Sequence, residues 1–175
     1  MPVDLKSKIR DIPDFPKRGI VFKDIMPLLA DPEALHETVE QLAEFAEPRK
    51  PDYILGAEAR GFILGAALAY RLNCGFVAAR KPGKLPWRTV SAKYALEYGF
   101  DALEMHVDAL IKGARVLIHD DLLATGGTAR AKIDLVEQLG AEVVGLAFVV
   151  ELSFLGGRDK VYGYDVHSLV QYETE

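Results

Sequence analysis

Residues 116–128 read Val-Leu-Ile-His-Asp-Asp-Leu-Leu-Ala-Thr-Gly-Gly-Thr, and this stretch decides the fold. It opens with three apolar, mostly β-branched residues, which is typical of a buried strand. Gly126 and Gly127 break that pattern, and a helical period then runs from Thr128 to about Gly140. The stretch therefore predicts a strand, a turn and a helix in succession, with two acids near the end of the strand.

The turn and the two acids point to a particular class of ligand. Consecutive backbone N–H groups in a glycine-containing turn, beside the positive end of a helix dipole, bind a phosphate without any basic side chain. Asp120 and Asp121 would repel that phosphate unless they faced hydroxyl groups or a divalent cation. The combination predicts a site for a phosphorylated sugar. No Gly-rich run ends in Gly-Lys-Ser/Thr and no G-x-G-x-x-G follows a strand, which argues against a P-loop or a dinucleotide site.

Length and composition describe an ordinary globular chain. Half of the 175 residues are hydrophobic and 27% are charged, and the length suits a single domain, residues 1–175, with one core. No apolar run approaches the ~18 residues that span a bilayer, and the first residues lack the apolar segment of a signal peptide. We therefore expect a cytoplasmic protein with no membrane partner.

Few side chains suit a metal or a nucleic acid. The lone Cys74 lies in an apolar context and predicts a buried structural thiol. The histidines are scattered without ligand spacing, so we expect them to be structural or solvated: His36, His106, His119 and His167. A net charge of −5 without a basic stripe argues against nucleic acid as a partner.

Strand and helix signals alternate along the chain and predict the α/β class. Strands are expected at 53–57, 75–80, 115–121, 142–152 and 161–172, and helices at 61–72 and 128–139. This order implies a mostly parallel twisted sheet with helices on both faces, whose ligands bind beyond the carboxyl ends of the strands. Residues 81–101 read as a long loop or ribbon, and about the first 30 as a cap of helix and turn.

The stretch 116–128 resembles the phosphoribosyl pyrophosphate (PRPP) signature of the type I phosphoribosyltransferases, with His119 where that family has an aliphatic residue. The resemblance implies the type I fold, with an N-terminal hood at about 1–33 and a flexible catalytic loop at about 81–101. It also implies that Asp120 and Asp121 contact the ribose hydroxyls. The loop implied to wrap the 5-phosphate consists of Ala124, Thr125, Gly126, Gly127 and Thr128.

Two further segments resemble the pyrophosphate-binding parts of that family. Glu58-Ala59-Arg60-Gly61 follows the first expected strand, and the resemblance implies a cis peptide between Glu58 and Ala59, with Arg60 as a catalytic residue holding the leaving pyrophosphate. Taken alone, this tetrapeptide would be a helix cap with a surface ion pair. The basic run that opens the flexible loop is implied to close over the same group through Arg80, Lys81 and Lys84. Mg²⁺ is implied to accompany PRPP, with no protein ligand assigned to it.

Residues 14–22 and 94–99 narrow the resemblance to the adenine phosphoribosyltransferases. In that group a hood stacks an aromatic ring on adenine and reads the base edge with backbone groups. These roles fall on Phe15, Lys17, Arg18 and Ile20. Glu97 is implied to be the catalytic acid or base, with Tyr98 beside it in the lid. The implied reaction joins adenine to PRPP to give AMP and pyrophosphate, in a homodimer.

Two other functions remain open from the sequence. A phosphoribosyltransferase for hypoxanthine, guanine or xanthine would need a donor for the 6-oxo group, and residues 148–155 contain no lysine for that purpose. A PRPP-sensing regulator on the same fold would need a DNA-binding extension or a basic surface, and neither is present in the sequence. Trp87 has no assigned role.

Overall fold

A sheet of five parallel strands forms the centre of the computed structural model, which describes residues 3–96 and 98–175. Its strand order is β4-β3-β7-β8-β9. The strands are β3 (Tyr53–Ala57), β4 (Gly75–Ala79), β7 (Arg115–Leu123), β8 (Glu142–Leu152) and β9 (Val166–Tyr172). The predicted α/β class is confirmed, and every pairing within this sheet is parallel.

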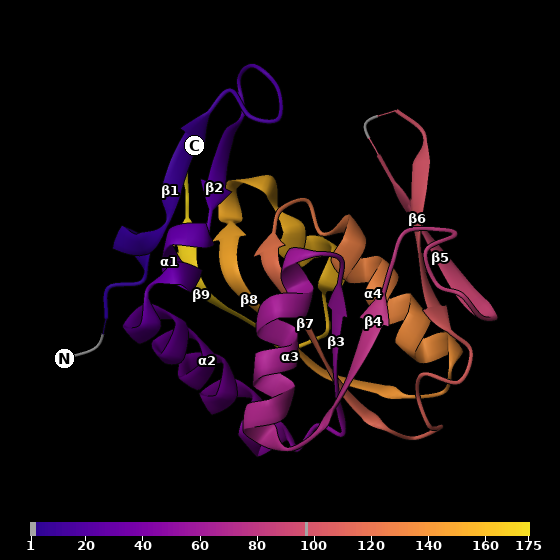
Figure 1. Cartoon of the computed structure of the whole chain (residues 1–175). Helices are drawn as coiled ribbons and strands as arrows, with labels where there is room; N and C mark the ends of the chain where they lie inside the picture. Colours follow the sequence, from indigo (N-terminus) through magenta and orange to yellow (C-terminus); the bar gives the residue numbers. More distant parts are fainter. Residues whose placement is uncertain (1–2, 97) are drawn as a thin grey trace.

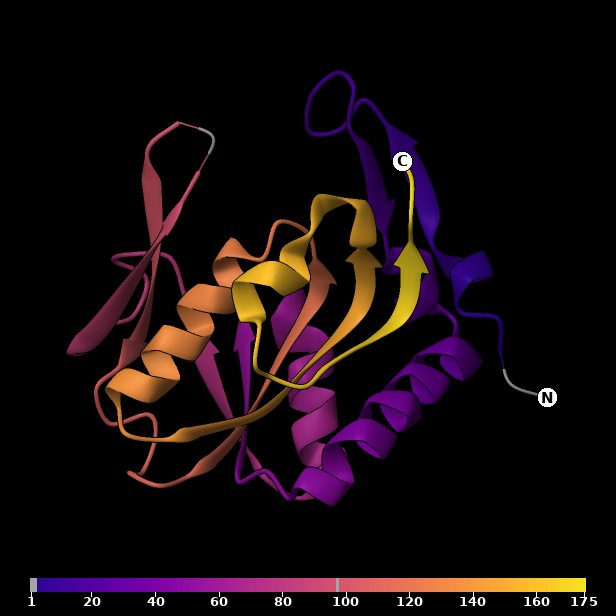
Figure 2. The ribbon, with the colours of Figure 1, turned by 180° about the vertical axis from the view of Figure 1, so that it is seen from behind.

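Helices cover both faces of the sheet, as expected (Figures 1 and 2). On one face α2 (Pro32–Ala46) and α3 (Arg60–Leu72) enclose a core that contains Leu117 of β7. On the other face α4 (Gly127–Gln138) packs over Val116 and Ile118 of the same strand. Because successive residues of a strand point to opposite faces, β7 contributes to both cores and is fixed at the centre of the molecule.

Two antiparallel pairs of strands stand outside the sheet. The hairpin consists of β1 (Arg10–Pro13) and β2 (Val21–Asp24), and the ribbon consists of β5 (Thr89–Ala95) and β6 (Phe100–His106). They project on either side of the edge at which the parallel strands end (Figures 1 and 2). The carboxyl edge of the sheet therefore lies between them.

The N-terminal segment differs from the expected cap of helix and turn. It contains the hairpin, in which Ile12 lies opposite Phe22 and Arg10 forms an ion pair of 2.6 Å with Asp24. The short helix α1 (Met26–Ala30) follows, and short 3₁₀ helices occur at Lys6–Lys8 and Glu47–Arg49. The sequence reading also left out α2, which begins after Asp31, whose carboxylate caps the helix by accepting from the N–H groups of Glu33 and Ala34.

The expected strand at 161–172 began too early. The strand starts at Val166, and the residues before it form 3₁₀ helices at Ser153–Leu155 and Gly157–Val161. Gly156 and Gly163 have φ angles of 68° and 92°, a left-handed conformation that cannot continue a strand. Of the two alternatives for 81–101, the ribbon is correct, and its second strand runs on to His106.

The neighbouring strands β3 and β7 form the topological switch point of the sheet. Gly56 of β3 pairs with His119 of β7, and the chain then turns into α3 on one face and into α4 on the other. The two connections diverge, which opens a crevice at the ends of these strands. Among the described residues, no helix combines the length and the apolar character that a membrane span requires.

Candidate active site

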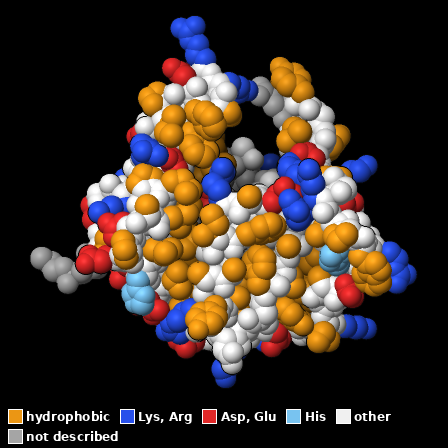
Figure 3. All heavy atoms as spheres, viewed as in Figure 1, with side chains coloured by type: hydrophobic (Ala, Val, Ile, Leu, Met, Phe, Trp, Pro, Cys, Tyr) orange, Lys and Arg blue, Asp and Glu red, His pale blue; other side chains and the backbone are white. Residues whose placement is uncertain are grey.

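A cavity of about 720 Å³ occupies the crevice at the ends of β3 and β7. Its walls are the segments Glu58–Arg60, 120–128 and 94–96, together with Lys160. The structure therefore brings together the residues predicted for pyrophosphate (58–60), for ribose (120 and 121) and for the 5-phosphate (124–128). Figure 3 shows the surface hollowed between the hairpin and the ribbon, above the same edge.

The loop between β7 and α4 presents the start of a helix to this cavity. Gly126 precedes α4 with a φ of 88°, and no side chain caps the helix. A Cβ atom on Gly126 would lie 2.5 Å from the carbonyl oxygen of Gly157, so only glycine fits there. The first N–H groups of α4 are thus left uncapped by any side chain, which is the arrangement that binds phosphate.

The segment after β3 has the cis peptide between Glu58 and Ala59 that the family resemblance implies. The Glu58 carboxylate accepts from the backbone N–H of Lys81 at 2.6 Å and from the Arg80 guanidinium at 3.2 and 3.3 Å. The Lys81 N–H, followed by Arg80, lowers the pKa of Glu58. Glu58 therefore fastens this segment to the end of β4, and Arg60 opens α3 at the cavity wall.

Arg60 and Asp121 connect the segment after β3 to the end of β7. The Arg60 Nε donates to Asp121 Oδ2 at 2.5 Å, with the Asp121 side chain 9% exposed. Burial and the neighbouring charge of Asp120 raise the pKa of Asp121 to about 6, although Arg60 acts in the opposite direction. Near neutral pH, Asp121 is thus a carboxylate that a modest change in its surroundings would protonate.

Asp120 lies on the other side of the strand end. Lys132 of α4 donates to its Oδ2 at 2.7 Å, and the backbone N–H of Asp121 donates to its Oδ1 at 2.9 Å. Burial opposes ionisation, but the Lys132 ammonium holds the pKa of Asp120 below its ordinary value. The two adjacent acids therefore differ in their tendency to bind a proton.

His119 is buried and structural, as expected. Its Nδ1 lies 3.0 Å from the carbonyl oxygen of Ala147 on β8, and a carbonyl only accepts, so Nδ1 carries the hydrogen. Burial lowers its pKa to about 4. The ring is therefore neutral at pH 7.

The hairpin residues predicted to bind the base do not line this cavity. Phe15 is half exposed and packs edge-on against Phe22, with ring centroids 5.2 Å apart. The Phe22 ring lies 5.1 Å from the Arg60 guanidinium, which connects the hairpin to the central site. The remaining predicted residues follow Phe15 in the turn of the hairpin: Lys17, Arg18 and Ile20.

The residues of the basic run and Tyr98 do not line the cavity either, although Arg80 and Lys81 contact residues that do. The Lys81 ammonium contacts Asp101 and the Tyr94 hydroxyl in the ribbon, and Arg80 is occupied by Glu58. Lys84 and Tyr98 are exposed. Glu97 lies outside the described residues.

Sequence reasoning missed several residues of the site, including three with polar side chains. Tyr94 and Lys160 line the cavity, and Lys132 supports Asp120 from behind. A signal for Lys132 was present, because it follows Ala129 by three residues and precedes Val136 by four, which places a lysine on the apolar face of the helix. Lys160 gave none, since it precedes the expected strand at 161–172 and belongs to none of the motifs.

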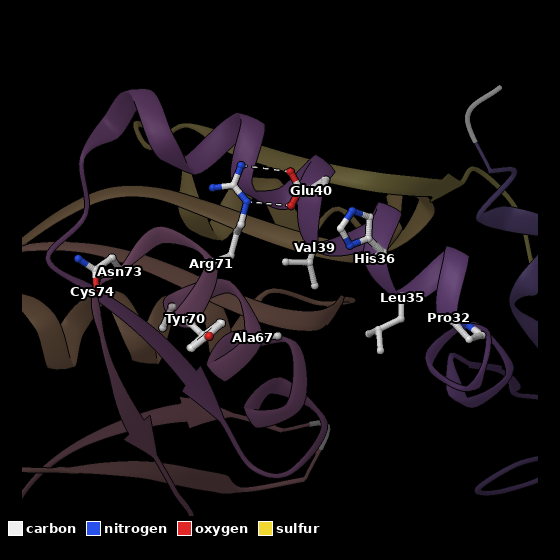
Figure 4. Close-up of a pocket in the computed structure, with 11 residues that line it drawn as sticks. Pro32, Leu35, His36, Val39, Glu40, Ala67, Tyr70, Arg71, Asn73 and Cys74 are labelled. Carbon is white, nitrogen blue, oxygen red and sulfur yellow. Dashed lines mark hydrogen bonds and ion pairs between the residues drawn. The ribbon is translucent and has the colours of Figure 1, made fainter.

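A second hollow, of about 840 Å³, lies between α2 and α3 (Figure 4). Its walls are largely apolar, with an ion pair of 2.8 Å between Arg71 and Glu40. Cys74 at its edge is half-buried rather than fully buried, and burial raises its thiol pKa. The hollow lacks the acids and the phosphate-binding turn of the first cavity, so we place the chemistry in the crevice.

The chain is similar to known proteins over nearly its whole length. Residues 30–171 match the phosphoribosyl transferase domain family. The chain is 58% identical over 171 residues to an adenine phosphoribosyltransferase of Acetivibrio thermocellus, covering 97% of this chain and all of that one. The crystal structure of adenine phosphoribosyltransferase from Thermoanaerobacter pseudethanolicus superposes with a TM-score of 0.94 at 56% identity, covering 97% and 98% of the two chains.

A more distant relative is known with ligands. The enzyme of the same name from Saccharomyces cerevisiae, in complex with adenine and an imino-altritol bisphosphate, has a TM-score of 0.91 at 41% identity. The similarity covers 95% of this chain and 96% of that one.

Proposed function

The chain belongs to the phosphoribosyltransferase family, among the adenine phosphoribosyltransferases, and from this premise we propose how its residues share the reaction. The enzyme transfers the 5-phosphoribosyl group of PRPP to N9 of adenine, which yields AMP and pyrophosphate and so salvages the purine. The observation that carries the assignment of roles is the cavity in which Arg60, the acids and the uncapped start of α4 converge.

The ribose 5-phosphate half of PRPP is held by the end of β7 and the start of α4. Asp120 and Asp121 accept hydrogen bonds from the ribose hydroxyls, and charge makes each of these bonds stronger than a neutral one. The backbone of residues 124–128 binds the 5-phosphate, with Lys160 on the cavity wall as an additional cation. This division keeps the negative phosphate away from the two carboxylates.

The pyrophosphate half faces the segment after β3. Arg60 binds the leaving group together with the backbone of Glu58 and Ala59, and Arg80, Lys81 and Lys84 close over it when the ribbon moves toward the hairpin. Magnesium brought in with the substrate would neutralise the charge of the pyrophosphate and ribose oxygens, and we assign it no protein ligand. Among the described residues, no group of three or more His, Cys, Asp or Glu side chains is placed to hold a metal ion.

The base is bound between the hairpin and the ribbon. Phe15 stacks on adenine, and the main chain of Lys17, Arg18 and Ile20 reads its edge. Glu97 exchanges a proton with the imidazole ring of the purine, and Tyr98 covers the site. The displacement passes through an oxocarbenium-like transition state, so the chain contributes positioning, charge neutralisation and exclusion of water.

The whole chain is proposed to form one domain, with 1–33 as the hood and 81–101 as the catalytic loop. Its substrate carries several negative charges and does not cross a membrane, which favours the cytoplasm as the place of reaction.

A homodimer is supported by the outer side of α3, where Ile63 and Tyr70 are 48% and 90% exposed. Hydrophobic side chains gather on the face that this helix occupies (Figure 3), and such patches mark protein interfaces.

The two halves of the site can be tested separately by ligand-induced thermal shifts. Ribose 5-phosphate and pyrophosphate should each raise Tm, and PRPP with Mg²⁺ should raise it most, because a ligand that binds only the folded state stabilises it. The Asp121→Asn variant should lose the response to ribose 5-phosphate and keep most of the response to pyrophosphate. An unchanged response to ribose 5-phosphate would remove this acid from the sugar site.

A further inference from the structure

Lys132 is a buried lysine to which the reaction has so far given no role. Its side chain on α4 is 0% exposed, and its neighbours on the same helix, Ala129, Ile133 and Val136, belong to the hydrophobic core. Placing an ammonium group in such surroundings is costly unless a group of opposite charge accompanies it. The position of Lys132 is therefore explained only by its partner.

That partner is Asp120, one of the two acids at the cavity. Its Oδ2 accepts from the Lys132 ammonium at 2.7 Å, and its Oδ1 accepts from the Asp121 N–H. Gly61 closes the third side, since a Cβ atom there would lie 2.7 Å from Oδ1. The carboxylate is thus enclosed by α4, by its own strand and by the start of α3, with 14% of its side chain left exposed.

The other titratable groups around Asp120 do not replace this lysine. Asp121 is a like charge, His119 is neutral at pH 7, and the Arg60 guanidinium is bound to Asp121. Among the described residues, Lys132 is the cation that hydrogen-bonds Asp120. Without it, Asp120 would be a buried carboxyl beside another acid, and both conditions favour its protonated form.

We propose that Lys132 is a positioning residue for PRPP, which holds the Asp120 carboxylate ionised and in a single orientation toward the ribose hydroxyls. The inference rests on the proposed role of Asp120 in the reaction. Lys132 does not touch the substrate; it acts through Asp120, from the interior of the protein. A charged acceptor fixed before the substrate arrives needs no reorganisation on binding, which favours affinity for the sugar.

The test is the kinetics of Lys132→Met, which keeps the length of the side chain and removes its charge. The KM for PRPP should rise by about tenfold or more at pH 7, because Asp120 becomes partly protonated, while the KM for adenine changes by less than about twofold. Raising the pH should restore the KM for PRPP, since Asp120 ionises again. If Lys132 only supported the fold, Lys132→Met would lower Tm, and the KM for PRPP would not depend on pH in this way.

The matched control is Arg130→Met on the same helix. Arg130 pairs with Asp134 at 3.0 Å on the exposed side of α4, so its removal should leave both KM values unchanged. Lys132→Gln keeps a hydrogen-bond donor without the charge and should give an intermediate KM for PRPP. If neither Lys132 variant folds at 20 °C, the ion pair serves the fold and the proposal is overturned.

A double-mutant cycle separates this inference from the proposed function. Adding Lys132→Met to Asp120→Asn should leave the KM for PRPP at the value of Asp120→Asn alone, because the lysine acts through that acid. If Asp120→Asn itself has the wild-type KM, the assignment of Asp120 to the sugar fails. If Asp120→Asn raises the KM and Lys132→Met does not, the positioning role of Lys132 alone is wrong.

Discussion

His119 makes the folding stability of this chain depend on pH. Its buried ring has a pKa of about 4, whereas an exposed histidine titrates near 6.5. Below pH 6.5 the unfolded chain therefore takes up a proton that the folded chain refuses, and the free energy of unfolding falls as the pH drops toward 4. Between pH 7.5 and 5 this residue should account for a loss of roughly 2 kcal/mol.

The His119→Val variant tests this linkage. Urea denaturation at pH 7.5 and pH 5 should show a smaller loss of unfolding free energy in the variant than in the wild type, by roughly 2 kcal/mol. Other titrating groups contribute equally to both proteins and cancel in the comparison. Equal losses in the two proteins would mean that His119 is protonated in the folded state.

Asp121 should bind the sugar through its charge. Asp121→Asn keeps the volume of the side chain and weakens a charge-assisted hydrogen bond of ~1.5–3 kcal/mol, so kcat/KM for PRPP should fall by about one to two decades with little change in Tm. Because its pKa is raised to about 6, the wild type should lose activity with PRPP as the pH falls below that value. Normal turnover together with a much lower Tm would make Asp121 structural.

The residues of the site differ in how far the sequence revealed them. Asp120, Asp121 and Arg60 were predicted because each lies near or just beyond the end of an expected strand, within a short motif, and the structure places them around one cavity. The pattern of α4 indicates that Lys132 is buried, but not that Asp120 is its partner, and no local pattern indicates that Lys160 lines the cavity. The roles of the predicted residues remain proposals until the variants are measured.

At the scale of elements, the loop between β7 and α4 depends on the backbone of Gly126. Gly126→Ala places a Cβ atom at positive φ and against the Gly157 carbonyl, so it should lower Tm and raise the KM for PRPP by about tenfold or more. Gly113 is the matched control, because its φ is 82° and nothing lies within 4 Å of the added atom.

The control defines what strain alone does. Gly113→Ala should lower the free energy of unfolding by about 1 kcal/mol, which lowers Tm by roughly 2–4 °C, and should leave the KM values for PRPP and adenine unchanged. Tm and steady-state kinetics of both variants provide the comparison. An equal effect of the two variants on PRPP would show that the Gly126 loop does not bind the phosphate.

Helices and strands were predicted correctly where the hydrophobic pattern was long. The predictions failed where tertiary contacts determine the structure. The strand at 142–152 and the helix α3 were placed within one residue, because each has a continuous apolar pattern. The hairpin was missed because its strands have four residues each and are stabilised by cross-strand pairs such as Arg10 and Asp24. The closing strand was placed too early because Val161 is apolar for another reason: it is buried in the core beside α4.

At the scale of the whole molecule, we expect the outer side of α3 to join two copies of the chain. Tyr70→Glu should reduce the mass in solution from about twice 19.3 kDa toward that of one chain, because it places a charge in an apolar contact. Tyr162→Glu is the matched control, since both tyrosines are 90% exposed. Light scattering after size exclusion measures the mass, and a Tyr70 variant with the wild-type mass would place the interface elsewhere.

The central claim is that this molecule joins adenine to the phosphoribosyl group of PRPP. It is tested most directly by incubating the protein with PRPP, Mg²⁺ and equal concentrations of adenine, hypoxanthine and guanine, and separating the nucleotides by chromatography. The account predicts AMP and pyrophosphate in equal amounts, with IMP and GMP at background. Formation of IMP or GMP at a rate similar to that of AMP, or of no nucleotide at all, would contradict it.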